Sequence, residues 1–171
     1  MPEIILKINH AEDKIYQSDN ICCYIVDSNL PQSVVDNIIK TGKMFLLFGA
    51  KNAEQVKSMQ ASGAVVSLDS SQPIKKQLRP LRESLGAKKV LGAIIDPSRH
   101  EAMLASEVEP EFIAFRITKQ NQDKARDIIA WYNELFLIQS AADLSRGVLD
   151  VSDLDVDFVI INSHDYNDFS C

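Results

Sequence analysis

Asp96, Arg99 and His100 are the residues whose types and spacing come nearest to a catalytic group in this chain. A histidine beside a carboxylate and a guanidinium could donate or accept a proton during a reaction. The same stretch also has the sequence of a helix start, with Ser98 as the cap and Arg99 and His100 in the first turn. We favour the capping role, and we therefore assign no residue to catalysis.

Asp69, followed by Ser70 and Ser71, is a second candidate, because magnesium prefers carboxylate oxygens as ligands. A turn that caps the next helix explains the same three residues, and we favour that interpretation. The sequence has no dinucleotide, Walker, Cys-x-x-Cys or Gly-x-Ser-x-Gly pattern, so nucleotide, zinc and hydrolase chemistry have no motif behind them.

Two of the three cysteines, Cys22 and Cys23, are neighbours in a segment that predicts a strand. Adjacent side chains on a strand point to opposite faces. We therefore expect these thiols to be poorly placed for binding one metal ion or for forming a disulfide with each other. Reduced, buried thiols in the cytosol are the interpretation we favour.

The elements that would position these residues alternate along the chain between apolar runs and helical patterns. The predicted strands cover residues 4–8, 21–26, 44–48, 64–68, 89–95, 111–115, 136–139 and 157–161. The predicted helices cover residues 31–41, 52–61, 73–86 and 98–107, a segment that ends at 136, and a short stretch within 143–155. This alternation predicts parallel strands and an α/β fold.

The predicted architecture is a single domain over residues 1–171, a shortened (β/α)8 barrel of the TIM type. Such barrels usually need about 250 residues. Two crossovers lack a full helix here, residues 9–20 and the segment after the eighth strand, so we expect the first and last helices to be eroded. An open doubly wound sheet is the alternative, because it tolerates missing edge helices.

The composition excludes several classes of partner. The formal net charge is −6, whereas nucleic acids and anionic membranes require a basic surface. No stretch approaches the apolar length of a membrane span, and the N-terminus does not have the pattern of a signal peptide. We therefore expect a cytoplasmic protein with no nucleic-acid or membrane partner.

Three segments resemble the thiamine-phosphate synthase family, whose members are (β/α) barrels. Residues 96–103 read D-P-S-R-H-E-A-M, similar to a D-S-R-H-x-A-M stretch in one branch of that family. Residues 112–115 are similar to the end of its A-D-Y-V-A-F strand, and residues 130–136 to its W-W-x-E-L-F helix. A weaker similarity extends from about residue 21 to residue 162.

The resemblance implies a transferase that joins a pyrimidine pyrophosphate to a thiazole phosphate with Mg²⁺. Most of the family's binding residues are not matched. Gly49 and Ala50 stand in place of an Asn-Asp pair, Ser71 stands near a metal-binding aspartate, and residues 140–144 replace a glycine-rich phosphate loop. Because losing one charge-stabilising group commonly costs ~10²–10³ in rate, the resemblance implies a degenerate member without the family's catalysis.

Thr118 and Lys119 match the family's T-x-T-K loop, and with Arg116 they could hold a phosphate; a solvated loop lysine is the alternative. We therefore expect a non-catalytic module that binds a small phosphorylated ligand or a protein, without a cofactor. A working thiamine-phosphate synthase, which would need Mg²⁺, is the alternative. An enzyme with new chemistry at the C-terminal mouth of the barrel, where the family binds its substrates, is a third hypothesis. No group of residues in the sequence supports it.

The two eroded crossovers also predict association. Without covering helices, the outward faces of residues 4–8 and 158–161 would meet water, and monomers seldom expose a large apolar patch. We therefore expect a homodimer built on this flank. The alternative is that residues 9–20 and 162–171 fold back over the flank and bring Tyr16, Tyr166 or Phe169 onto it.

Overall fold

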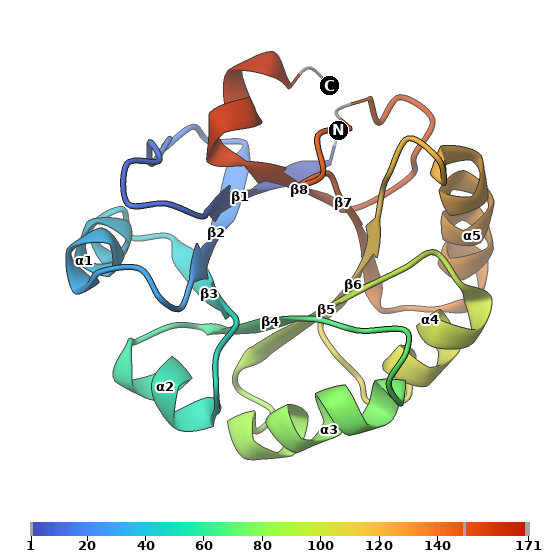
Figure 1. Ribbon diagram of the computed structural model, residues 1–171, viewed down its shortest axis with the longest axis horizontal. Helices are drawn as coiled ribbons and strands as arrows, with labels where there is room; N and C mark the ends of the chain where they lie inside the picture. The colour runs from blue at the N-terminus through green and yellow to red at the C-terminus, as the bar shows by residue number, and fades with distance from the viewer. Residues whose placement is uncertain (1, 149, 170–171) are drawn as a thin grey trace.

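The computed structural model describes residues 2–148 and 150–169, and its eight parallel strands close into a barrel (Figure 1). Each strand pairs with the next along the chain, and the last pairs with the first. The strands are β1 (Glu3–Ile8), β2 (Ile21–Asp27), β3 (Met44–Phe48), β4 (Gly63–Ser67), β5 (Val90–Ile95), β6 (Phe112–Arg116), β7 (Gln139–Asp143) and β8 (Phe158–Asn162). The predicted (β/α)8 barrel is confirmed, and the open sheet is wrong.

The α-helices lie outside the ring, on the side of β2 to β7 (Figure 1). They are α1 (Gln32–Lys40), α2 (Ala53–Ser58), α3 (Ile74–Leu85), α4 (Arg99–Ser106) and α5 (Gln122–Leu135). The connection from β1 to β2 is a loop, and β8 is followed by a six-residue 3-10 helix, η1 (Ser163–Asp168). The predicted erosion at both ends of the chain is therefore confirmed.

The short helix expected within residues 143–155 is wrong in the described part of that segment, which is irregular. The Asp143 carboxylate accepts a hydrogen bond from the Ser145 backbone N–H at 3.1 Å. The Asp150 carboxylate accepts bonds from the Ser152 backbone N–H and hydroxyl at 3.1 and 2.8 Å. Such local side-chain bonds offer the backbone an alternative to the helix.

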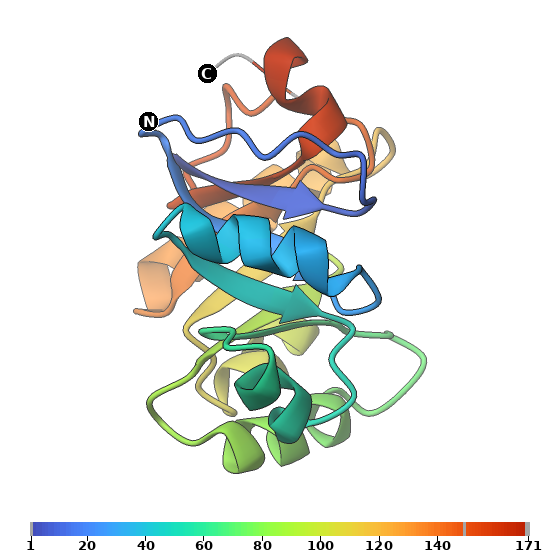
Figure 2. The same cartoon turned by 90° about the vertical axis from the view of Figure 1, so that its left-hand side faces the viewer.

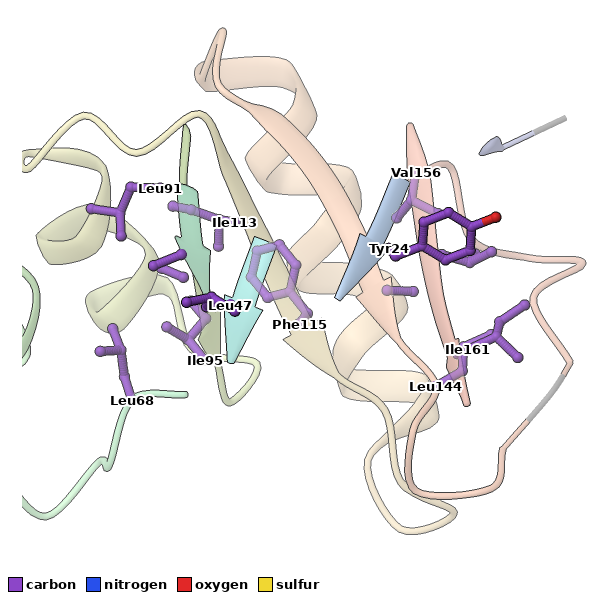
Figure 3. Packing of buried hydrophobic residues seen from close by; sticks show 14 of the residues in the cluster. Tyr24, Leu47, Leu68, Leu91, Ile95, Ile113, Phe115, Leu144, Val156 and Ile161 are labelled. Atoms are coloured by element: carbon purple, nitrogen blue, oxygen red, sulfur yellow. The ribbon is translucent and has the colours of Figure 1, made fainter. Parts of the chain in front are cut away.

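The core has two apolar layers, because successive strand residues point to opposite faces. The layer inside the ring takes one residue from the middle of each strand: Ile5, Ile25, Leu46, Val65, Ile94, Ala114, Ala141 and Ile160. The outer layer fills the space between the strands and their covering segments, and Figure 3 shows part of it, including Leu47, Ile95 and Phe115. The same alternation determines which residues near the two ends of each strand face the interior of the barrel.

Most strand boundaries differ from the prediction by one residue, and two of the differences affect the mouth. β6 extends to Arg116, which was expected in a loop, and β7 begins at Gln139 rather than at residue 136. Phe136 instead stacks on Tyr132 of α5, with ring centroids 4.8 Å apart, and so belongs to the helix packing. As a consequence, Arg116 and Asp143 are each the last residue of a strand, and both face the interior of the barrel.

The flank that lacks α-helices is covered by the chain itself. The loop after β1 and η1 both lie outside β1 (Figure 2), and Ile4, Leu6 and Ile8 are buried. The rings of Tyr16 and Tyr166 lie 4.4 Å apart, and both pack against the outer layer. The expectation of an exposed flank is therefore wrong, and the alternative, in which loop and tail fold back, is confirmed as far as Phe169; residues 170–171 of the expected tail lie outside the described residues.

Gly92 tests the tight packing at the base of the barrel. A Cβ atom at this position would overlap the Phe112 ring, although the Gly92 backbone itself is unstrained for other residues. We expect Gly92→Ala to lower the free energy of unfolding by about 1–3 kcal/mol, measured by urea denaturation. Adding Phe112→Leu should recover part of that loss; a fully additive double variant would contradict the proposed overlap.

Candidate functional site

The C-terminal mouth of the barrel is ringed by polar side chains. The residue two positions after each member of the inner layer faces the same interior, one level nearer the mouth. These residues are Lys7, Asp27, Phe48, Ser67, Asp96, Arg116, Asp143 and Asn162. All but Phe48 are polar, whereas the level below is wholly apolar. Barrels of this type place their active sites at this end, where the βα loops meet.

Arg116 ties three strand ends together at the mouth. Its guanidinium is buried and forms an ion pair with Asp96 at 3.0 Å. It also donates to the Ser67 hydroxyl at 2.7 Å and to the backbone carbonyls of Leu68 and Ile94. These bonds occupy most of its donors inside the protein, so Arg116 has little capacity left for a ligand.

Asp96 is an ionised partner of Arg116 rather than a proton donor. Burial acts to raise the pKa of Asp96, but hydrogen bonds from Ser70 and Arg116 outweigh it and hold the pKa below its usual value. The Ser70 hydroxyl lies 2.8 Å from Asp96 and 2.8 Å from the buried Glu101 carboxylate. Ser98 accepts a bond from the Glu101 backbone N–H, which confirms it as the cap of α4.

The remaining members of the two clusters proposed from sequence do not converge on the mouth. Arg99 lies over the Trp131 ring, 5.2 Å from its centroid, and His100 is exposed. The Asp69 carboxylate accepts bonds from the Ser71 backbone N–H and hydroxyl, which lower the pKa of Asp69. Asp69 therefore forms a turn, as we favoured, but the expectation that this turn caps the next helix is wrong, because the N-cap of α3 is Pro73 and has no side-chain cap bond. Within residues 2–148 and 150–169, no three His, Cys, Asp or Glu side chains cluster as metal ligands would.

Lys7 is the cation of the mouth that is not paired with a carboxylate among the described residues. Its ammonium lies 4.1 Å from the centroid of the Phe48 ring and forms no ion pair in the described part of the chain. Burial lowers the pKa of Lys7; the nearby Asp143 and Asp27 charges oppose this shift, and Arg146 adds to it. The mouth thus holds a partly desolvated cation with carboxylates and a second cation around it.

The three residues predicted to hold a phosphate lie in different surroundings, and the prediction is not tested by them. Arg116 points into the ring, whereas Lys119 is exposed on the loop between β6 and α5. The Thr118 backbone N–H donates to Asn121 at 2.9 Å, and Asn121 in turn donates to the Arg116 carbonyl at 2.9 Å. Sequence reasoning missed Lys7, although its place two residues after Ile5 in a predicted strand was the signal that could have found it.

Comparisons with known proteins support the fold. No protein-family model matches the chain, and no curated protein matches it in sequence. A structure of tryptophan synthase from M. tuberculosis, an open form with BRD0059 bound, is 12% identical with a TM-score of 0.66, over 95% of this chain and 83% of that one. A protein from Aquifex aeolicus VF5 is also 12% identical, with a TM-score of 0.63 and the same coverage. At this identity the likeness shows the TIM-type barrel alone. None of the described helices is long and apolar enough to cross a membrane.

Arg116→Met tests whether the mouth depends on the buried guanidinium. The change leaves the buried carbonyls of Leu68 and Ile94 without their donor, while the half-exposed Asp96 charge is still solvated. We therefore expect the free energy of unfolding to fall by about 1–3 kcal/mol. Arg126→Met is the matched control, because Arg126 pairs with Asp123 and Asp153 on the exposed surface. Exposed pairs contribute about 0–1 kcal/mol, and equal losses in the two variants would contradict the assignment.

The same variant carries a pH signature. Because the folded pKa of Asp96 lies below its unfolded value, its contribution to stability is present at neutral pH and is lost as pH falls through the folded pKa. Arg116→Met removes one cause of that lowered pKa. Urea denaturation of both proteins from neutral to acidic pH should therefore show a smaller stability loss for the variant.

Proposed function

We propose that this barrel binds a small phosphorylated compound at its mouth and that, as a thiamine-phosphate-synthase-like chain, it does not carry out that family's reaction. The observation that supports the binding role is the position of Lys7. It offers a cation at the end of the barrel where ligands of this fold bind, without an internal ion pair in the described residues.

A bound anion would offset two effects that disfavour the charged form of Lys7, namely its burial and its repulsion by Arg146. Burial disfavours the Lys7 ammonium, and a bound negative charge would stabilise it. The positive charge of the exposed Arg146 also lowers the pKa values of both Lys7 and Asp96, so it lies close to the mouth. An anion between Lys7 and Arg146 would turn a repulsion between two cations into two attractions.

The neighbouring carboxylates restrict what else the ligand can carry. Asp27 and Asp143 both act on Lys7, and each has one carboxylate oxygen engaged by a backbone N–H, from Asn29 and Ser145 respectively. Their other oxygens can accept bonds from a ligand. A compound with one anionic group and hydroxyl or amino donors fits this mouth better than a bare polyanion, which the two aspartates would repel.

The loop residues Thr118 and Lys119, with the backbone around Arg116, stay as a second proposed position for the phosphate. They match the family's loop in sequence, and Lys119 is exposed and accessible. If the chain instead works as a thiamine-phosphate synthase, this loop would face the substrate phosphate, and Mg²⁺ would be required. Arg116, the third residue of the proposed group, is committed to Asp96.

Calorimetric titration with glycerol 3-phosphate, which has one phosphate and two hydroxyl groups, and with sulfate tests the binding role. We expect Lys7→Met to weaken binding by about tenfold or more, because charge-assisted contacts are individually strong. Lys119→Ala tests the loop position, and Lys124→Ala, on the exposed face of α5, is the matched control. No binding to the unmodified protein, or equal losses in all three variants, would contradict the proposal.

The pH dependence of sulfate binding separates Lys7 from an ordinary surface lysine. Sulfate keeps its charge from neutral to alkaline pH, so changes in its affinity report on the protein. Because the pKa of Lys7 lies below the usual 10.5, affinity should begin to fall at a lower pH than a surface lysine would give. Lys7→Met should flatten this part of the profile.

The lack of the family reaction is tested directly with the pyrimidine pyrophosphate, the thiazole phosphate and Mg²⁺. We expect no thiamine phosphate above background, because no group of charges at the mouth matches the family's pyrophosphate and metal site. An authentic family member serves as the positive control. Turnover at about 1 s⁻¹ or faster would contradict this proposal and favour the working enzyme.

A protein partner is a second candidate, favoured by one surface. Met103 of α4 and Leu135 and Leu137 at the end of α5 are exposed and line a shallow groove. The expected homodimer stays a proposal, and a second copy of the chain would now cover this groove rather than the flank.

Light scattering at micromolar concentration should give twice the 19.1 kDa chain mass for the unmodified protein, and Leu137→Asp should reduce that mass. A mass near 19.1 kDa for the unmodified protein would contradict the dimer.

A further inference from the structure

The N-terminal end of the barrel, opposite the polar mouth, contains an apolar cavity of about 300 Å³. Its lining includes Leu46 from the inner layer and the rings of Phe112 and Phe158, whose centroids lie 6.3 Å apart. Cys22 and Cys23 lie on the same wall. The exposed side chains of Glu3, Glu111 and Gln139 also line it. The cavity therefore combines mainly apolar walls with two thiols, a combination that the mouth does not have.

An irregularity in β2 brings the two thiols to one wall. Ile4 of β1 pairs with Ile21, but the next residue, Ile5, pairs with Cys23, so Cys22 is an extra residue in the ladder. Such a bulge breaks the alternation of side chains. The expectation that Cys22 and Cys23 point to opposite faces is therefore wrong, because both residues line the cavity and pack with the inner layer.

The two thiols are also chemically unequal. A hydrogen bond between them lowers the pKa of Cys22, whereas that bond and burial raise the pKa of Cys23. The Cys22 thiol also lies 3.4 Å from the Ile4 carbonyl, and it is partly exposed while Cys23 is buried. Cys22 is thus the thiol that an incoming reagent meets first and that ionises more readily, which makes it the first nucleophile.

We propose that Cys22 and Cys23 form a dithiol site for a trivalent arsenical, or a similar thiophilic centre, that carries an apolar substituent. With phenylarsine oxide, each sulfur forms a bond to arsenic and each thiol gives up its proton. The two protons leave with the arsenic-bound oxygen as water, and no atom changes oxidation state. The phenyl group would occupy the apolar cavity, beside Phe112 and Phe158.

Two adjacent thiols bind such a centre far better than one. Once Cys22 has formed the first As–S bond, Cys23 closes the second within the same molecule, at a high effective concentration. Monothiols such as glutathione then compete poorly for the arsenic, whereas a small dithiol can remove the arsenic from the protein. This difference gives the site a signature that a single reactive cysteine does not have.

Intact-mass spectrometry with phenylarsine oxide tests the pairing. With excess glutathione present, the unmodified protein and Cys171→Ala should each retain one phenylarsenic group, and 2,3-dimercaptopropanol should remove it. Cys22→Ala and Cys23→Ala should each lose the group under glutathione. Retention in either of these variants, or loss in Cys171→Ala, would overturn the proposal.

Folding and the cavity need their own controls. Circular dichroism tests whether each variant is folded. If Cys23→Ala does not fold, the result for Cys22→Ala, at the partly exposed position, decides whether the site needs both thiols. Arsenite, which has no substituent, tests the cavity. The ratio of the affinity for phenylarsine oxide to that for arsenite should be roughly tenfold or more higher for the protein than for a free dithiol. The reason is that the phenyl ring moves from water into the apolar cavity. Equal preference would overturn the role assigned to the cavity.

Discussion

The closure of the barrel, through the pairing of β1 with β8, is the constraint on which the rest of the structure depends. The two strands are in register from Glu3 opposite Phe158 to Lys7 opposite Asn162. Once the ring is closed, residues two apart on every strand lie at successive levels of one interior. A wholly apolar level in the middle then separates a polar mouth from a mainly apolar base, and the chemistry available at each end follows from that division.

Arg116 determines the electrostatics of the mouth. A guanidinium at this depth requires several acceptors, and it takes them from β4, β5 and the start of the following loops. Asp96 supplies the negative charge. The pairing neutralises both residues, so they stabilise the strand ends rather than a ligand. Lys7, across the ring, is left as the cation that can serve a ligand.

The sequence was sufficient for the fold because its strands and helices have clear periodicities, and the two eroded crossovers were visible as missing patterns. It was insufficient for the site, where single residues decide. The apolar run at 136–139 looked like a strand, but Phe136 stacks on Tyr132, and the true β7 is the less apolar stretch from Gln139 to Asp143. The bulge at Cys22 depends on its pairing with β1, which no local pattern encodes.

The shortening of the chain also determines how the mouth is framed. TIM-type barrels build their sites from the loops that follow the strands, and here two long connections flank β8: the loop after β1 and the segment between β7 and β8. Asn162 joins them, because it accepts from Asn9 at 2.8 Å and donates to the Ser145 carbonyl at 2.8 Å. Arg146 follows Ser145 directly, and Lys7 lies beside Asn162 in the ladder. The same contact that replaces missing helices therefore holds both proposed anion-binding cations at one edge of the mouth.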